Sequence, residues 1–225
     1  MNEKNFQKLL HDAEEYEDVL DLLHPEDKVD PDLTKLETLS FTPSSKLAIV
    51  VGHTKRSPGA KGVAPISMHE YFWNNKLASN IKSISSQNDI ECAIFFRDGI
   101  GISGAYKEVS DWSPNSCIEL HFNAYNGQVK GTETLYGEHD QSKIWADTLQ
   151  NAMVVLYTRT TVHDRGIKLR KISERGGKNV NQLDNIPSCL IEPYFGDELS
   201  EAVLAKDHLV ELAQAIVTAH KNIFN

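Results

Sequence analysis

Long hydrophobic runs are missing from this sequence. No stretch approaches the roughly 18 to 20 apolar residues that a membrane-spanning helix needs, and the first residues, MNEKNFQKLL, lack the basic start and apolar core of a secretion signal. We therefore expect neither a membrane span nor a signal peptide. Cysteine is scarce too: Cys92, Cys117 and Cys189 are odd in number and stand in apolar runs, which predicts free, buried thiols and no disulfide framework.

Basic charge is also low, since 23 lysines and arginines face 32 acidic residues and leave a formal net charge of -9. The imbalance is concentrated at the start of the chain, where residues 1–46 contain 12 acidic residues and 5 lysines, a net charge of -7. Binding to nucleic acid needs clustered Lys and Arg that displace counterions from phosphates. The sequence therefore predicts no nucleic-acid partner.

The first 46 residues have the pattern of a separate appendage. Apolar residues recur at spacings of three and four along residues 1–23, which predicts an amphipathic helix with an acidic outer face. Prolines 25, 31 and 43 predict a linker after it. We therefore divide the chain into a helical N-terminal segment, 1–46, and a main domain, 47–225. A tether, a cap on the main domain, and an arm for self-association or for a protein partner all fit residues 1–23.

From Leu47 on, short apolar runs alternate with longer segments of helical spacing. This alternation is typical of an α/β domain whose central sheet is covered by helices on both faces. The predicted strands cover residues 47–52, 92–96, 117–122, 132–137 and 188–192. The predicted helices cover residues 70–86, 141–158 and 199–223.

Three candidate metal ligands stand at the ends of these elements. His53 follows the first strand, Glu70 opens the first helix, and His121 lies near the end of the third strand. Such side chains meet in the crevice at the carboxyl edge of an open α/β sheet. Two imidazoles and one carboxylate form a zinc ligand set that leaves a fourth position for water, whose pKa the metal lowers to about 7. The sequence therefore predicts one bound Zn²⁺.

A second carboxylate, Glu192, ends the apolar run IPSCLIE. An unpaired carboxylate is costly to bury in a purely structural strand. In the same crevice, Glu192 could accept a proton from the attacking water and pass it to the leaving amine. Glu192 is therefore the predicted general base and acid of an amide hydrolase.

Each of these residues also has an ordinary structural explanation. A single histidine is more often hydrogen-bonded within a fold than bound to a metal, and Glu70 suits the first turn of a helix because of the helix dipole. Glu192 could pair with a cation such as Arg170. Scattered ligands are also less specific than a compact motif such as H-E-x-x-H.

Six segments, in order between about Leu47 and Phe224, resemble the zinc-dependent N-acetylmuramoyl-L-alanine amidases of bacterial cell division and of many phage lysins. VVGHTKRSPGAKG resembles a strand followed by G-H and P-G-A, and HEYFWNNKLASNI resembles a helix that opens with a glutamate. IELHFNA resembles an H-x-N-A segment, and GTETLYG resembles the G-x-E strand after it. DRGIK resembles a D-R-G segment, and IPSCLIEPYFGD resembles a P-x-x-L-x-E-x-x-F segment.

The resemblance implies a mixed, roughly six-stranded sheet with helices on both faces and a shallow groove that contains one zinc ion. It implies hydrolysis of the amide between the lactyl group of N-acetylmuramic acid and L-alanine of the peptidoglycan stem peptide. The matching positions are His53, Glu70 and His121 for zinc and Glu192 for catalysis. We also expect Asn123 and Arg165 to orient the substrate.

The chain departs from the family around the first ligand, where V-G-H-T-K-R-S replaces the aspartate, proline and Gly-rich turn of many members. His69 directly precedes Glu70, but neighbours on a helix point in different directions, so we expect the carboxylate to be the ligand. His163, before the D-R-G segment, has no motif support. Members of the resembled family that are controlled by an activator carry an inserted helix that plugs the site. No long insertion separates His121 from Glu192, so the resemblance implies a site that is open without an activator.

Two other functions remain open. A zinc peptidase that cuts within the stem peptide could use the same ligands and base. A wall-binding or assembly module could carry the domain without turnover, although no ligand or base is missing. With no signal peptide expected, we predict an enzyme made in the cytoplasm, a lysin that reaches the peptidoglycan through a holin-like pore or with a phage or secretion machine.

Overall fold

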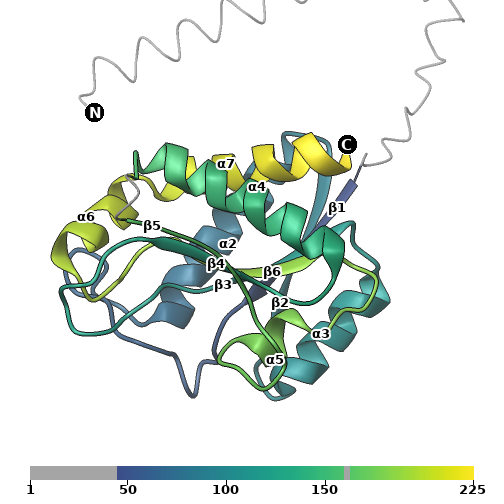
Figure 1. Ribbon diagram of the computed structural model, residues 1–225, viewed down its shortest axis with the longest axis horizontal. Helices are drawn as coiled ribbons and strands as arrows, with labels where there is room; N and C mark the ends of the chain where they lie inside the picture. Colours follow the sequence, from purple (N-terminus) through teal and green to yellow (C-terminus); the bar gives the residue numbers. More distant parts are fainter. Residues whose placement is uncertain (1–44, 160–162) are drawn as a thin grey trace, which may run out of the picture. The chain divides into compact units, whose positions relative to one another are not determined.

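The computed structural model describes residues 45–159 and 163–225 (Figure 1). The helix and the linker predicted before residue 45 lie outside these ranges, and the division of the chain at residue 46 stays a prediction. Within the described residues, no helix has the length and apolar character needed to cross a membrane. The cysteines Cys92, Cys117 and Cys189 are free thiols, as expected; Cys117 and Cys189 are buried, whereas Cys92 is only half-buried.

A six-stranded mixed sheet forms the centre of the domain and confirms the predicted fold class. Its strands lie in the order β2-β1-β3-β6-β4-β5. All neighbouring strands are parallel except β4 and β6, which are antiparallel. The bounds are Ser45–Val51 for β1, Ile90–Phe96 for β2, Ser116–Leu120 for β3, Thr132–Tyr136 for β4, Asp164–Leu169 for β5 and Ser188–Glu192 for β6.

Strand β1 is hydrophobic on both sides because both faces of the sheet are covered. Leu47, Ile49 and Val51 point into the larger core, and the alternate residues Ala48 and Val50 point into a second core on the opposite face. All five are fully buried. The unbroken apolar run that predicted this strand therefore reflects two cores separated by the sheet.

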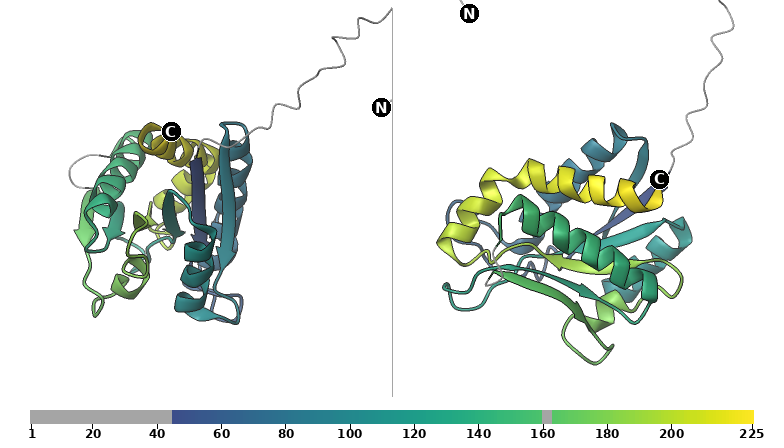
Figure 2. Two further views of the ribbon diagram at one scale, coloured as in Figure 1. Left: turned by 90° about the vertical axis from the view of Figure 1, so that its right-hand side faces the viewer. Right: turned by 45° about the horizontal axis from the view of Figure 1, so that its top comes forward.

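Helices cover the two faces unequally. The larger core lies under α2 (Glu70–Ser86), α4 (Asp140–Leu156) and α7 (Leu209–Phe224), and the smaller core lies under α3 (Gly101–Trp112). In Figure 1, α4 and α7 lie above the sheet, whereas α3 and the short α5 (Gly177–Val180) lie below it. The right-hand view of Figure 2 shows α4 and α7 side by side.

Four features differ from the expectation. Strand β5, helix α3 and the short helix α5 are not among the elements that the apolar pattern predicts. The helix predicted over 199–223 is two helices, α6 (Leu199–Asp207) and α7, which meet at His208. The other two predicted helices are confirmed to within two residues at each end.

Candidate metal and catalytic site

Polar side chains converge at one edge of the sheet, where β1, β3 and β6 end. His53 comes two residues after β1, His121 directly follows β3, and Glu192 is the last residue of β6. Strand β4 runs the other way, so its start lies at the same edge and Glu133 pairs with Glu192. The crevice expected at the carboxyl edge of a parallel sheet is thus completed by an antiparallel strand.

His53, Glu70 and His121 form a compact cluster. One carboxylate oxygen of Glu70, Oε1, lies 2.6 Å from Nδ1 of His121, and the other, Oε2, lies 3.1 Å from Nε2 of His53. The two imidazole rings are edge to face, with centroids 4.9 Å apart. One potential ligand atom from each residue lies within 4.8 Å of the others, so the cluster could hold a metal ion.

Two glycines allow the cluster to close up. A Cβ atom at Gly52 would lie 2.4 Å from Nε2 of His121, and one at Gly59 would lie 2.7 Å from both Oε2 of Glu70 and Cδ2 of His53. Gly59 also has a φ of 79°, a left-handed conformation that suits glycine. Any side chain at either position would push the three donors apart.

The electrostatics of Glu70 suit a cation. Burial opposes ionisation of this carboxyl group, but hydrogen bonds with His121 and His53 outweigh it and lower its pKa to about 2. The backbone N–H of Phe122 donates a further hydrogen bond to Oε1 at 3.1 Å. A fixed carboxylate between two imidazoles is a donor set that zinc accepts. The residues present therefore fit a zinc ion.

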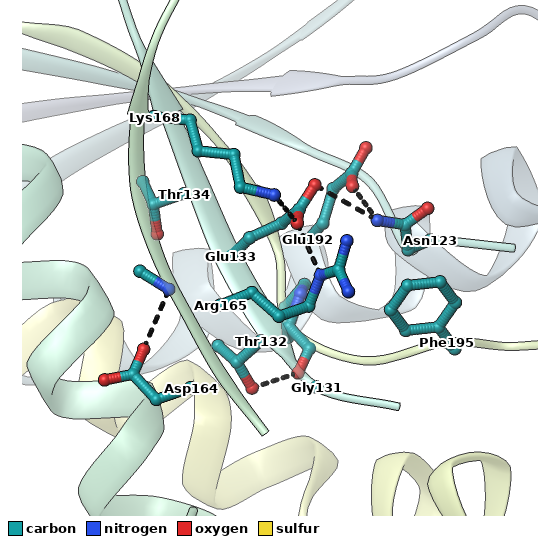
Figure 3. Close-up of polar contacts among 12 residues, drawn as sticks. Asn123, Gly131, Thr132, Glu133, Thr134, Asp164, Arg165, Lys168, Glu192 and Phe195 are labelled. Atoms are coloured by element: carbon teal, nitrogen blue, oxygen red, sulfur yellow. Dashed lines mark hydrogen bonds and ion pairs between the residues drawn. The ribbon is translucent and has the colours of Figure 1, made fainter. Parts of the chain in front are cut away.

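Glu192 lies buried beside Glu133 and Asn123 (Figure 3). The side-chain amide of Asn123 donates hydrogen bonds to both carboxylates, Oε2 of Glu192 and Oε1 of Glu133. Burial raises the pKa of Glu192, and the neighbouring negative charge of Glu133 raises it further. A carboxyl group whose pKa is raised can both accept and return a proton near neutral pH.

Glu133 is held ionised by two cations from β5. The guanidinium Nε of Arg165 lies 2.6 Å from Oε2 of Glu133, and Nζ of Lys168 contacts the same oxygen. Burial raises the pKa of Glu133, but these hydrogen bonds outweigh it and lower the pKa. The Arg165 guanidinium also lies over the ring of Phe195, 5.2 Å from its centroid, so both sides of this cation are fixed.

Two adjoining hollows connect these groups. His53, Glu70 and His121 line one of them, and Asn123, Glu133 and Arg165 line the other. The residues that line both are Ala124, Leu135, Arg175 and Glu192. Glu192 thus lies between the three-donor cluster of His53, Glu70 and His121 and a cationic wall, formed by Arg165, Lys168, Arg170 and Arg175.

All six site residues predicted from the sequence therefore lie along this pair of hollows: His53, Glu70, His121, Asn123, Arg165 and Glu192. His69 does not join the cluster, because its Nδ1 donates to the carbonyl oxygen of Gly59 at 2.9 Å. The carbonyl oxygen of His163 accepts the backbone N–H of Thr132. Two further buried carboxylates of the same region, Glu133 and Glu119, are not among the residues predicted from the sequence.

The fold and these side chains define an α/β domain with a metal-capable cluster and a buried carboxylate beside it, an arrangement that suits an amide hydrolase. The family model described as N-acetylmuramoyl-L-alanine amidase matches residues 47–222. The chain belongs to this family, and the predicted amide-hydrolase class is confirmed. Among curated proteins, none matches the chain significantly.

Solved amidase structures share the fold. The catalytic domain of CwlV from Bacillus (Paenibacillus) polymyxa is 21% identical, with a TM-score of 0.68 over 79% of this chain and 97% of that one. An amidase from Clostridium difficile 630 is 24% identical, with a TM-score of 0.68 over 81% of this chain and 100% of that one. The catalytic domain of the CD27L endolysin, which targets Clostridia difficile, is 24% identical, with a TM-score of 0.61 over 79% and 97%.

Proposed function

We propose that the chain hydrolyses the amide between N-acetylmuramic acid and L-alanine in peptidoglycan, with His53, Glu70 and His121 binding one zinc ion and Glu192 moving the proton. One observation carries the assignment of roles: Glu192, with its raised pKa, lines the same hollow as the three-donor cluster. Family membership supplies the substrate bond.

When bound, zinc would polarise the amide carbonyl and make a water molecule more acidic. Glu192 accepts a proton from the attacking water as the new C–O bond forms. It then returns that proton to the amide nitrogen as the C–N bond breaks, which releases a carboxylic acid and an amine. Asn123 holds the Glu192 carboxylate through its amide N–H.

Arg165 is proposed to orient the substrate in the neighbouring hollow. Its guanidinium is fixed by Glu133 and Phe195 and stands within the cationic wall beside Glu192. A fixed guanidinium can bind a carbonyl or carboxylate of the stem peptide through two parallel hydrogen bonds. Such a contact would align the scissile amide with Glu192.

Variants of Glu192 and His121 test the assigned roles. Glu192→Gln keeps the shape of the side chain, so we expect it to bind one zinc ion per chain and to lose about 10²- to 10⁴-fold in rate. His121→Ala is expected to lose both zinc and activity. Glu108→Gln removes an exposed carboxylate on α3 and is the matched control. Full activity in Glu192→Gln would refute its role.

We further propose that the site of action is the cell wall, which the peptidoglycan bond requires. The likeness in fold to the CD27L endolysin domain is compatible with a bacteriolytic role. The release route through a holin-like pore or a delivery machine stays a prediction, as does a partner or self-association through residues 1–23.

A further inference from the structure

Glu119, on β3, is a fully buried carboxylate that the proposed mechanism does not use. Four side chains surround it. Nη1 of Arg97 lies 2.8 Å from Oε1, the hydroxyl of Tyr106 lies 2.7 Å from Oε2, and the Asn179 amide lies 2.9 and 2.8 Å from the two oxygens. The fourth contact is with His121, whose Nε2 lies 3.1 Å from Oε1.

The two ring nitrogens of His121 therefore face different carboxylates. Nδ1 faces Glu70 in the three-donor cluster, and Nε2 faces Glu119 on the other side of the ring. The Nε2 side is also closed by backbone, since a Cβ atom at Gly52 would lie 2.4 Å from this nitrogen. Only Nδ1 is available to a metal ion shared with His53 and Glu70.

We propose that Glu119 is a positioning residue that selects the tautomer and the orientation of His121. An ionised carboxylate can only accept hydrogen bonds, so its contact with Nε2 requires a proton on that nitrogen. The lone pair of the neutral ring is then on Nδ1, aimed at the cluster. This inference rests on the proposed zinc site. In it, Glu119 has the role of an outer carboxylate, which does not bind the metal but orients a histidine that does.

The partners of Glu119 explain how the carboxylate is held in place. Arg97 follows β2, Tyr106 belongs to α3 and Asn179 belongs to α5. Three separate parts of the chain therefore fix the two carboxylate oxygens of Glu119. Both helices lie on the face of the sheet opposite α4 and α7 (Figure 1). The position of His121 thus depends on packing on that face as well as on the strand that precedes it.

Zinc affinity distinguishes this role from a merely structural one. Glu119→Gln removes the charge and keeps the size of the side chain, so we expect zinc affinity to fall about 10- to 100-fold. Glu108→Gln is the matched control, because it removes an exposed carboxylate from α3 and leaves the partners of Glu119 and its contact with His121 in place. We expect its affinity to stay within about threefold of the wild type. Competition with a chelating dye measures both, after circular dichroism shows that each variant is folded.

The nitrogen resonances of His121 in the zinc-loaded wild-type chain give a second test that does not depend on how a variant folds. In ¹⁵N-labelled protein, we expect Nε2 to carry the proton and Nδ1 to show the shift of a metal ligand. Metallated Nε2, or equal zinc affinity in Glu119→Gln and the wild type, would overturn the role of Glu119 and leave the zinc amidase intact. A wild-type chain that binds no zinc would overturn both.

Discussion

Glu133 and Glu192 lie directly opposite each other on the antiparallel strands β4 and β6. Their surroundings shift the pKa values of the two carboxyl groups in opposite directions. Arg165 and Lys168 overcome the effect of burial and lower the pKa of Glu133, whereas burial and the charge of Glu133 raise the pKa of Glu192. A pair of carboxyl groups with opposite shifts is a common way to keep one charged and let the other exchange protons.

Removing the charge of Glu133 is predicted to change the pH dependence of catalysis. The base form of Glu192 is lost as the pH falls through its raised pKa, so kcat/KM falls on the acid side. Glu133→Gln removes a negative neighbour and frees two cations, and both effects lower the pKa of Glu192. We expect the acid limb of the pH–rate profile to move to lower pH. Glu138→Gln, an exposed carboxylate, is the control, and a limb that stays in place would contradict the coupling.

A charge added at Asn123 is predicted to have the opposite effect. Asn123→Asp has nearly the same shape but places a third carboxylate next to Glu192 and removes the N–H donor that contacts it. The pKa of Glu192 should rise further, so the acid limb should move to higher pH. Each unit of that shift lowers the rate on the acid side about tenfold. A pH profile of kcat/KM for the variant, beside that of Asn123→Ala, measures the displacement.

Stability below pH 6.5 is predicted to depend on His220. The ring is fully buried between the hydroxyls of Ser45 and Ser116, each 2.9 Å away. Ser45 donates its proton to Asn225, so it can only accept from Nε2 of His220, and the neutral ring satisfies both contacts. Burial lowers the pKa of His220 from 6.5 to about 4.

The sign of this effect follows from the proton balance. The unfolded chain binds a proton at His220 more tightly than the folded chain does, so the stability contributed by the neutral ring is complete above pH 6.5. This contribution is lost as the pH falls from 6.5 towards 4. The loss is about 3 kcal/mol, at 1.36 kcal/mol for each unit of pKa shift. Urea unfolding across this range measures the slope. His220→Asn should flatten it; an unchanged slope in this variant would assign the effect to other groups.

The buried ion pair between Arg159 and Glu201 is predicted to matter more than an exposed pair. Two guanidinium nitrogens of Arg159 contact the two oxygens of Glu201 at 2.5 and 2.8 Å, and both side chains are buried. Arg159→Met leaves an unpaired buried carboxylate, which costs about 3 to 5 kcal/mol. Lys107→Met breaks the exposed pair with Asp111 and should change the unfolding free energy by less than about 1 kcal/mol. Equal effects in denaturant titrations would contradict the distinction.

Elements with a strong apolar pattern could be predicted from the sequence, and those without one could not. The helix predicted over 70–86 begins and ends where expected, because its apolar face packs on the sheet. Strand β5, with the sequence DRGIKL, is polar and lies at the edge of the sheet, so it lacks the alternation of a buried strand. The break at His208 lies within a continuous periodic pattern, and no proline or glycine marks it.

The candidate site shows a similar division. His53, Glu70, His121 and Glu192 could be found because each stands beside a predicted strand or helix end. Glu119 and Glu133 were missed, although each is a carboxylate within a buried strand. Each of them, like Glu192, is a buried charge that needs a partner. Their cationic and hydrogen-bonding partners come from the residue after β2 and from α3, α5 and β5, and only the fold brings these together.

Mass spectrometry of purified peptidoglycan after digestion tests the central claim most directly. The zinc-loaded chain would be compared with a chelated sample and with Glu192→Gln. We expect release of intact stem peptides that begin with a free L-alanine amine, and we expect this product to be lost in both controls. Cleavage within the stem, with L-alanine still attached to the sugar, would show a zinc peptidase. No cleavage of any wall would contradict the enzymatic account and favour a binding or assembly module.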